Sequence, residues 1–233
     1  MPRRALAEKR PWLLASLFFG VTWMFVGESR LPGLYQIGWK GAGVGFLAIY
    51  AFARHAGTDG RLLTAVMALG AVGDCAIEID PVAGGAAFFA AHLFAIALYA
   101  RHRRDTTTAS QKMLAVALLI GVPLSGYFLP SERNMALPIA LYALALGGMA
   151  GMAWTSSFPR YRVGTGALLF VASDLLIFAR MGPLANSALP DILIWPLYYC
   201  GQLLICTGVL KMLRAAAHPR VDRRSAGHRP MPR

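Results

Sequence analysis

The chain has 233 residues, of which 57% are hydrophobic and only 15% are charged. A soluble domain of this size carries about 25% charged residues and alternates polar with apolar positions. Here whole stretches are apolar around the full helical circumference, so the composition excludes a soluble globular domain. It predicts an all-α, polytopic protein of the cell membrane. The net charge of +12 does not indicate nucleic acid as a partner, because the basic residues lie at the ends of apolar runs.

Eight apolar runs are long enough to cross a bilayer as helices, and short connections with turn residues separate them. We predict a single transmembrane domain of eight helices over residues 1–213. The segment Arg214–Arg233 is rich in Arg, Pro and His, and we expect a disordered basic cytoplasmic tail there. The predicted spans are Pro11–Gly27, Gly33–Ala53, Arg61–Ile79, Gly84–Ala100, Gln111–Leu129, Asn134–Trp154, Val163–Ala179 and Asp191–Leu213.

The basic residues predict the orientation of these spans. Of the 23 Lys and Arg residues, 19 lie in the two terminal segments or in the even-numbered connections, on one side of the predicted membrane. Cytoplasmic loops of membrane proteins carry an excess of Lys and Arg. We therefore expect both termini to be cytoplasmic.

Two aspartates interrupt the apolar runs. Asp74 follows Gly73 in the third predicted span, and Asp174 follows Ser173 in the seventh. A carboxylate at bilayer depth costs about 2.5–3.5 kcal/mol on insertion scales, and it is tolerated where it faces a protein interior or a water-filled cavity. Both spans are expected to run outward, and a rise of about 1.5 Å per residue places both carboxylates roughly 18–20 Å from the cytoplasmic edge.

Other polar side chains fall near the same layer, and together they predict a polar cavity that opens toward the outer half of the membrane. Several have a simpler alternative: Lys40 could snorkel from a span end, His92 could be a core histidine, and one of the two adjacent tyrosines could serve packing alone. Glu78 and Asp80 could simply be solvated near the interface, and we expect this for Asp80 at the outer mouth. The residues predicted to line the cavity are Lys40, Glu78, His92, Tyr198, Tyr199 and Gln202.

The order of these residues resembles the YhhN-like family of eight-span membrane proteins, which includes the lysoplasmalogenases. The resemblance covers nearly the whole chain. It departs from the family pattern at Gly41, where Pro usually follows the lysine, and at Glu78 and Asp80, where apolar residues are typical. It is carried by Lys40, by Gly73-Asp74, by the stretch from Gly85 to His92 with Tyr99, by the stretch from Gly166 to Asp174, and by Tyr199-Cys-Gly-Gln202.

The resemblance implies hydrolysis of the vinyl ether bond of a lysoplasmalogen, which yields a fatty aldehyde and a glycerophospho-base. Paired carboxyl groups suit this chemistry, because one can protonate the alkene carbon while the other orients water and stabilises the oxocarbenium ion. We assign the acid to Asp174 and the water-orienting role to Asp74. The substrate-binding residues we expect are Lys40, Glu78, His92, Tyr199 and Gln202.

The expected partners are a lysophospholipid substrate and the membrane lipids, with no metal, no cofactor and no nucleic acid. The sequence carries no signal for an oligomeric state. The main alternative is a proton-coupled transporter of a solute or lipid that uses the same aspartates. A catalytically silent lipid-binding protein of the same fold is a third hypothesis. An intramembrane aspartyl protease is disfavoured because Ala71 replaces the first glycine of its Gly-x-Gly-Asp motif.

Overall fold

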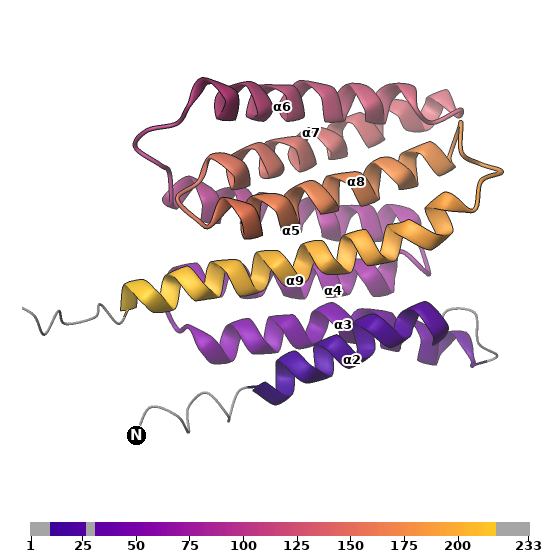
Figure 1. The fold of residues 1–233 in the computed structure, drawn as a ribbon. Helices are drawn as coiled ribbons and strands as arrows, with labels where there is room; N and C mark the ends of the chain where they lie inside the picture. Colours follow the sequence, from indigo (N-terminus) through magenta and orange to yellow (C-terminus); the bar gives the residue numbers. More distant parts are fainter. Residues whose placement is uncertain (1–9, 27–30, 218–233) are drawn as a thin grey trace, which may run out of the picture.

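A computed structural model describes residues 10–26 and 31–217, and this part of the chain folds as an all-helical bundle (Figure 1). The predicted all-α fold class is confirmed for these residues. The helices are α2 (Arg10–Val26), α3 (Gly33–Arg54), α4 (Thr58–Ala76), α5 (Pro81–Arg101), α6 (Ala109–Phe128), α7 (Arg133–Thr155), α8 (Thr165–Arg180) and α9 (Leu189–Ala217), with a short π-helix η1 (Arg160–Gly164) before α8.

Each of the eight predicted spans coincides with one of these α-helices, and the differences lie at the ends. Helix α4 ends at Ala76 and not at Ile79, so Glu78 lies on the turn that follows the helix. Helix α5 begins at Pro81 because the Asp80 carboxylate accepts hydrogen bonds from the N–H groups of Val82 (2.8 Å) and Ala83 (3.4 Å). Asp80 is therefore a helix N-cap, with proline at the first helical position.

The end of the chain also differs from the prediction. Helix α9 continues to Ala217, so the first four residues of the predicted disordered tail are helical. The remainder of that tail, residues 218–233, lies outside the described residues, as do residues 1–9 and 27–30 at the start of the chain and after α2.

The described helices run up and down the bundle, and most consecutive helices pack against each other, except that α5 packs against α7 and not against α6 (Figure 1). Helix α9 also contacts α2, α3 and α4, so it lies between the two helices that carry the aspartates, α4 and α8.

Five segments are long and apolar enough to cross a membrane: α5, α6, α7, η1 with α8, and α9. Large apolar side chains point away from the bundle, including Phe25 at 75% and Leu34 at 79% exposure. These features are those of an integral membrane protein.

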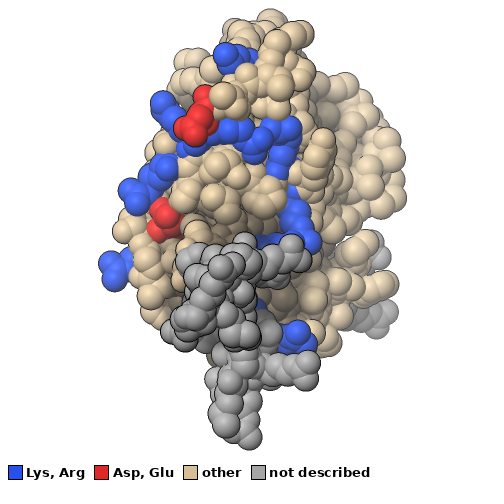
Figure 2. All heavy atoms as spheres, turned by 60° about the vertical axis from the view of Figure 1, so that its left-hand side comes forward, with Lys and Arg blue, Asp and Glu red and all other residues tan. Residues whose placement is uncertain are grey.

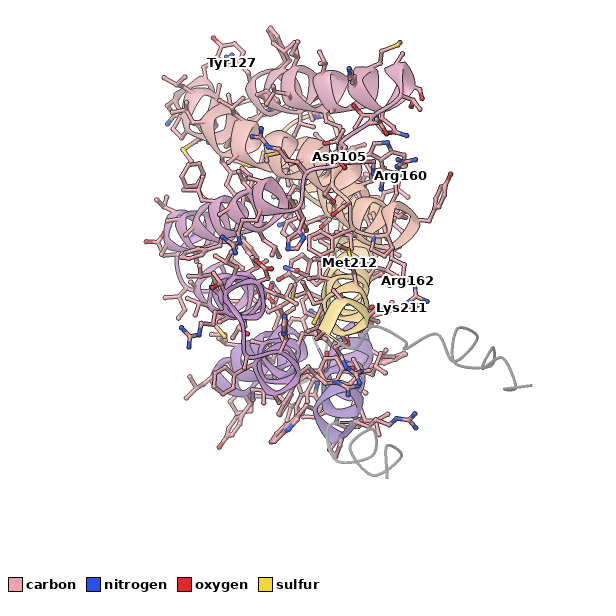
Figure 3. The ribbon with its side chains drawn as sticks, turned by 90° about the vertical axis from the view of Figure 1, so that its left-hand side faces the viewer. Asp105, Tyr127, Arg160, Arg162, Lys211 and Met212 are labelled. Carbon is pink, nitrogen blue, oxygen red and sulfur yellow. The ribbon has the colours of Figure 1, made fainter. Side chains whose placement is uncertain are left out.

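Basic side chains gather at one end of the bundle, the end where α2 begins and α9 ends (Figure 2). Figure 3 looks along the bundle from this end, where Arg160 and Arg162 of η1 and Lys211 of α9 are labelled. The other Lys and Arg residues at the helix ends on this side are Arg10, Arg54, Arg61, Arg101, Lys112 and Arg214.

Backbone contact between α8 and α9 fixes the position of Asp174 relative to α9. A Cβ atom on Gly201 would lie 2.7 Å from the carbonyl oxygen of Gly166, and one on Gly166 would lie 2.7 Å from that of Gly201. Small residues allow this close approach of membrane helices. Since the obstacle is backbone, any side chain at either position forces the helices apart.

Replacing Gly201 by Ala is expected to destabilise the protein by about 1–3 kcal/mol, the usual range for overpacking. The matched control is Gly121→Ala in α6, because a Cβ atom there meets nothing within 4 Å. The control should be neutral or stabilising, by at most about 1 kcal/mol. Unfolding of both variants in detergent measures the difference, and equal stabilities would contradict the packing described here.

Candidate active site

Asp74 is buried where α4 faces α9, and a tyrosine holds its carboxylate. The Tyr198 hydroxyl donates a hydrogen bond to Asp74 Oδ2 at 2.9 Å, and Gln202 Nε2 lies 3.5 Å from the same hydroxyl. Gly70 makes room for this group, because a Cβ atom there would lie 3.0 Å from Gln202 Nε2 and 3.4 Å from Tyr198 Oη. The structure thus brings two predicted site residues, Asp74 and Gln202, onto one tyrosine.

Asp174 is held in the same way by a different tyrosine. The Tyr142 hydroxyl of α7 donates to Asp174 Oδ2 at 2.6 Å. His92 of α5 places its Nε2 atom 3.1 Å from the same hydroxyl. In the simpler alternative, a core histidine, the ring would bond to a backbone carbonyl, whereas the hydrogen bond described for His92 is to a side chain of another helix.

A tyrosine hydroxyl carries a single proton, and this restricts how the second group can bond. When Tyr142 donates to Asp174, it can only accept from His92, which must then carry its proton on Nε2. If the carboxyl group were the donor instead, Tyr142 could donate to His92 in the other tautomer. The three side chains therefore form a chain of hydrogen bonds that can reverse its direction.

One phenylalanine joins the two carboxylate centres. The Phe170 ring lies 5.1 Å from the His92 ring and 5.1 Å from the Tyr198 ring, measured between centroids, and 6.2 Å from the Phe88 ring. Asp174 also lies within electrostatic range of Tyr198. Asp74 and Asp174, which are 100 residues apart in sequence, therefore lie in two neighbouring groups of polar side chains in the interior of the bundle, and we call the two groups together the polar centre.

The other predicted site residues lie around this centre. Lys40 forms an ion pair with Glu78, with Nζ 2.5 Å from Oε1, and its charge is within electrostatic range of Asp74. Tyr199 turns away from the carboxylates, because its hydroxyl lies 2.9 Å from Ser16 Oγ of α2. The tyrosine next to Asp74 is thus Tyr198, and Tyr199 packs against α2.

The predicted polar cavity is closed in this structure. Asp74, His92, Asp174 and Gln202 are each at most 4% exposed, because the surrounding aromatic rings fill the space between the helices. A hollow of about 420 Å³ lies between α3 and α4, and its lining is apolar. The structure therefore places these four side chains in the interior of the bundle, and the described residues form no open polar cavity around them.

Tyr142 was not predicted from the sequence, although a signal was present. Tyr142 lies nine residues after Arg133, where α7 begins. Asp174 lies six residues before Arg180, where α8 ends, and these two helix ends are at the same end of the bundle. The depth argument that selected His92 would therefore have selected Tyr142, had hydroxyl groups in apolar spans been included.

Comparison with known proteins supplies related sequences. A family model described as the YhhN family matches residues 35–209. A protein of Mycobacterium bovis named lysoplasmalogenase is 30% identical over 211 residues, which cover 83% of this chain and 80% of the relative. A protein of the same name from Mycobacterium tuberculosis matches to the same extent. The human protein lysoplasmalogenase TMEM86B is 34% identical over 158 residues, 65% of this chain and 64% of its own length. No solved structure matches.

Tyr142 and Asp174 are expected to be energetically coupled, because each is the other's buried hydrogen-bond partner. Tyr142→Phe alone leaves the carboxyl group without its donor and should cost about 1–3 kcal/mol of stability. The double variant with Asp174→Asn should lose less stability than the sum of the losses of the two single variants, by about 0.5–3 kcal/mol. Unfolding in detergent measures all four proteins of the cycle. Additive losses would show that the contact carries no energy.

Proposed function

The chain belongs to the YhhN family, and from this we propose that it is a membrane-embedded hydrolase of lysoplasmalogen-type lysophospholipids. It cleaves the vinyl ether bond and releases a fatty aldehyde and a glycerophospho-base. The observation that carries the proposal is the pair of buried carboxyl groups, Asp74 and Asp174, held by separate tyrosines within one polar centre.

The reaction needs an acid and a water molecule. Transfer of a proton to the alkene carbon that does not bear the oxygen converts the vinyl ether to an oxocarbenium ion. Water then adds to the carbon that bears the oxygen, and the resulting hemiacetal collapses to an aldehyde and the free glycerol hydroxyl. Rate-limiting protonation of carbon is the kind of step that a positioned carboxylic acid accelerates.

Asp174 is the proposed acid. A carboxylic acid enclosed by apolar groups and without a cationic partner keeps its proton, and the described ion pairs include none to Asp174. Tyr142 engages Oδ2, which leaves Oδ1 to deliver the proton. The chain of His92 and Tyr142 orients the carboxyl group. The proton that Asp174 gives up is replaced at the end of the turnover by the proton that the attacking water releases.

Asp74 is the proposed water-orienting carboxylate. Lys40, whose positive charge lies within electrostatic range of Asp74, is the cation that distinguishes the surroundings of Asp74 from those of Asp174. An ionised carboxylate accepts the proton that water loses as it attacks, and its negative charge stabilises the oxocarbenium ion. Two carboxyl groups with different surroundings thus take different roles, as in glycosidases.

We further propose that all eight α-helices span the membrane and that both termini are cytoplasmic. The support is the collection of Lys and Arg side chains at the end of the bundle where α2 begins and α9 ends (Figure 2). This orientation places Lys40 and Glu78 toward the outer face and the closed basic end toward the cytoplasm.

Purified protein in detergent is expected to release aldehyde from a lysoplasmalogen. Asp174→Asn and Asp74→Asn should each lower the rate by about 10²-fold or more, since each removes a group that takes part in proton transfer. Asp191→Asn is the matched control, because this carboxylate is 69% exposed and pairs with Arg180.

Thermal stability must be measured beside activity, so that loss of folding is not mistaken for loss of chemistry. Full activity in either Asp74→Asn or Asp174→Asn would contradict the paired mechanism. A folded parent protein that releases no aldehyde would contradict the hydrolase itself. Proton-coupled transport of a solute or lipid would then be tested in vesicles.

The proposed orientation is testable with single cysteines introduced at opposite ends of the bundle, at Asp105 and Glu132, into a protein whose own cysteines are replaced by alanine. A membrane-impermeant thiol reagent applied to intact cells should label the Glu132 position and spare the Asp105 position. Lysed cells, in which both positions should react, provide the control. The opposite pattern of labelling would reverse the assignment.

A further inference from the structure

An ion pair at the outer end of the polar centre is enclosed by two indole rings. The Lys40 ammonium lies 5.9 Å from the centroid of Trp23 in α2 and 6.0 Å from that of Trp195 in α9. The two rings are 5.9 Å apart with planes inclined by 60°. Glu78, on the turn after α4, completes the group, with its Oε1 atom 2.5 Å from Lys40 Nζ. We call Trp23, Lys40, Glu78 and Trp195 the ammonium cage.

The cage differs from an ordinary surface ion pair. The other described ion pair at this end joins Arg180 to Asp191 at 3.3 Å, and its side chains are 51% and 69% exposed. In the cage the Lys40 side chain is only 17% exposed, while the Glu78 side chain, at 40%, remains accessible. Aromatic faces beside a carboxylate are the arrangement that proteins use to hold ammonium ligands. Here a cation of the protein itself occupies that position.

The cage is also connected to the polar centre. The Trp195 ring lies 5.6 Å from the Tyr198 ring, and Tyr198 donates to Asp74. Glu78 follows Asp74 by four residues, close to one helical turn of about 5.4 Å. In a glycerophospholipid, the glycerol backbone separates the phosphate from the ether oxygen by a comparable span. A lipid with its ether bond at the carboxylates would therefore place its head group at the cage.

We propose that the ammonium cage binds the head group of the substrate by exchange of ion pairs and so selects zwitterionic over anionic head groups. The lipid phosphate takes Lys40, while the lipid ammonium takes Glu78 and the faces of Trp23 and Trp195. Both protein charges remain paired after the exchange. An anionic phosphoglycerol head group has no ammonium, so it leaves Glu78 unpaired beside a phosphate of the same sign. The identity of the lipid rests on the function proposed above, whereas the selection by charge rests on the cage.

Binding of lysophospholipids with a saturated ether chain tests the cage without any reaction, because this bond cannot undergo the proposed hydrolysis. Two such lipids with the same chain, one with a phosphocholine and one with a phosphoglycerol head group, are titrated into the full-length protein in maltoside micelles. The phosphocholine lipid should bind about tenfold more tightly. Equal affinities for the two lipids would overturn the proposal.

Variants identify the residues responsible. Glu78→Gln should remove most of the tenfold preference, because it weakens ammonium binding and removes the repulsion of the anionic lipid. Trp23→Leu should weaken phosphocholine binding several-fold. Asp191→Asn, with the same change of charge at the same end, and Trp12→Leu, at the opposite end of α2, are the matched controls and should keep the preference. A preference that survives in Glu78→Gln would overturn the assignment of the cage.

Failure of the cage and failure of the hydrolase are distinguishable. Selective binding of the phosphocholine ether lipid by a protein that releases no aldehyde from a lysoplasmalogen would refute the hydrolase and support the cage. Aldehyde release without selection between head groups would refute the cage and leave the hydrolase standing.

Discussion

The structure depends on one constraint, which is the burial of two carboxyl groups inside an apolar bundle. A buried carboxyl group without hydrogen-bond partners is strongly unfavourable, so each must receive a donor from a neighbouring helix. Tyr198 of α9 supplies that donor to Asp74, and Tyr142 of α7 supplies it to Asp174. Since the donors come from other helices, these contacts fix how α4 and α8 are placed against the rest of the bundle.

The helix packing serves the same constraint. Gly70 lets α4 approach Tyr198 and Gln202, and the contact between Gly166 and Gly201 brings α8 against α9. Helix α9 therefore lies between the two aspartates and contributes Tyr198 to the centre that they form. The resulting asymmetry, with a lysine near Asp74 and a histidine–tyrosine chain at Asp174, gives the two carboxyl groups different surroundings, and the different roles proposed for them rest on this difference.

The positions of the helices could be read from the sequence because apolar runs of membrane length are separated by short connections. The convergence of Asp74, His92, Asp174 and Gln202 was predictable from depth alone. The choice between Tyr198 and Tyr199 was not, because adjacent residues on a helix point about 100° apart and a helix that is apolar all round gives no pattern that fixes its rotation. For the same reason the sequence could not decide whether Lys40 pairs with Glu78 or with an aspartate. The closing of the cavity by aromatic rings depends on side-chain packing, which the sequence pattern does not reveal.

The central claim is that a carboxylic acid of the protein protonates the alkene carbon and that water then adds to the neighbouring carbon. The most direct test is to run the reaction in deuterated water with immediate borohydride trapping of the aldehyde, followed by mass spectrometry. The account predicts one carbon-bound deuterium, on the carbon next to the new alcohol carbon. Parallel runs in ¹⁸O-water should leave the glycerophospho-base unlabelled. Absence of the deuterium, or ¹⁸O in the glycerophospho-base, would contradict hydrolysis through the vinyl ether carbon.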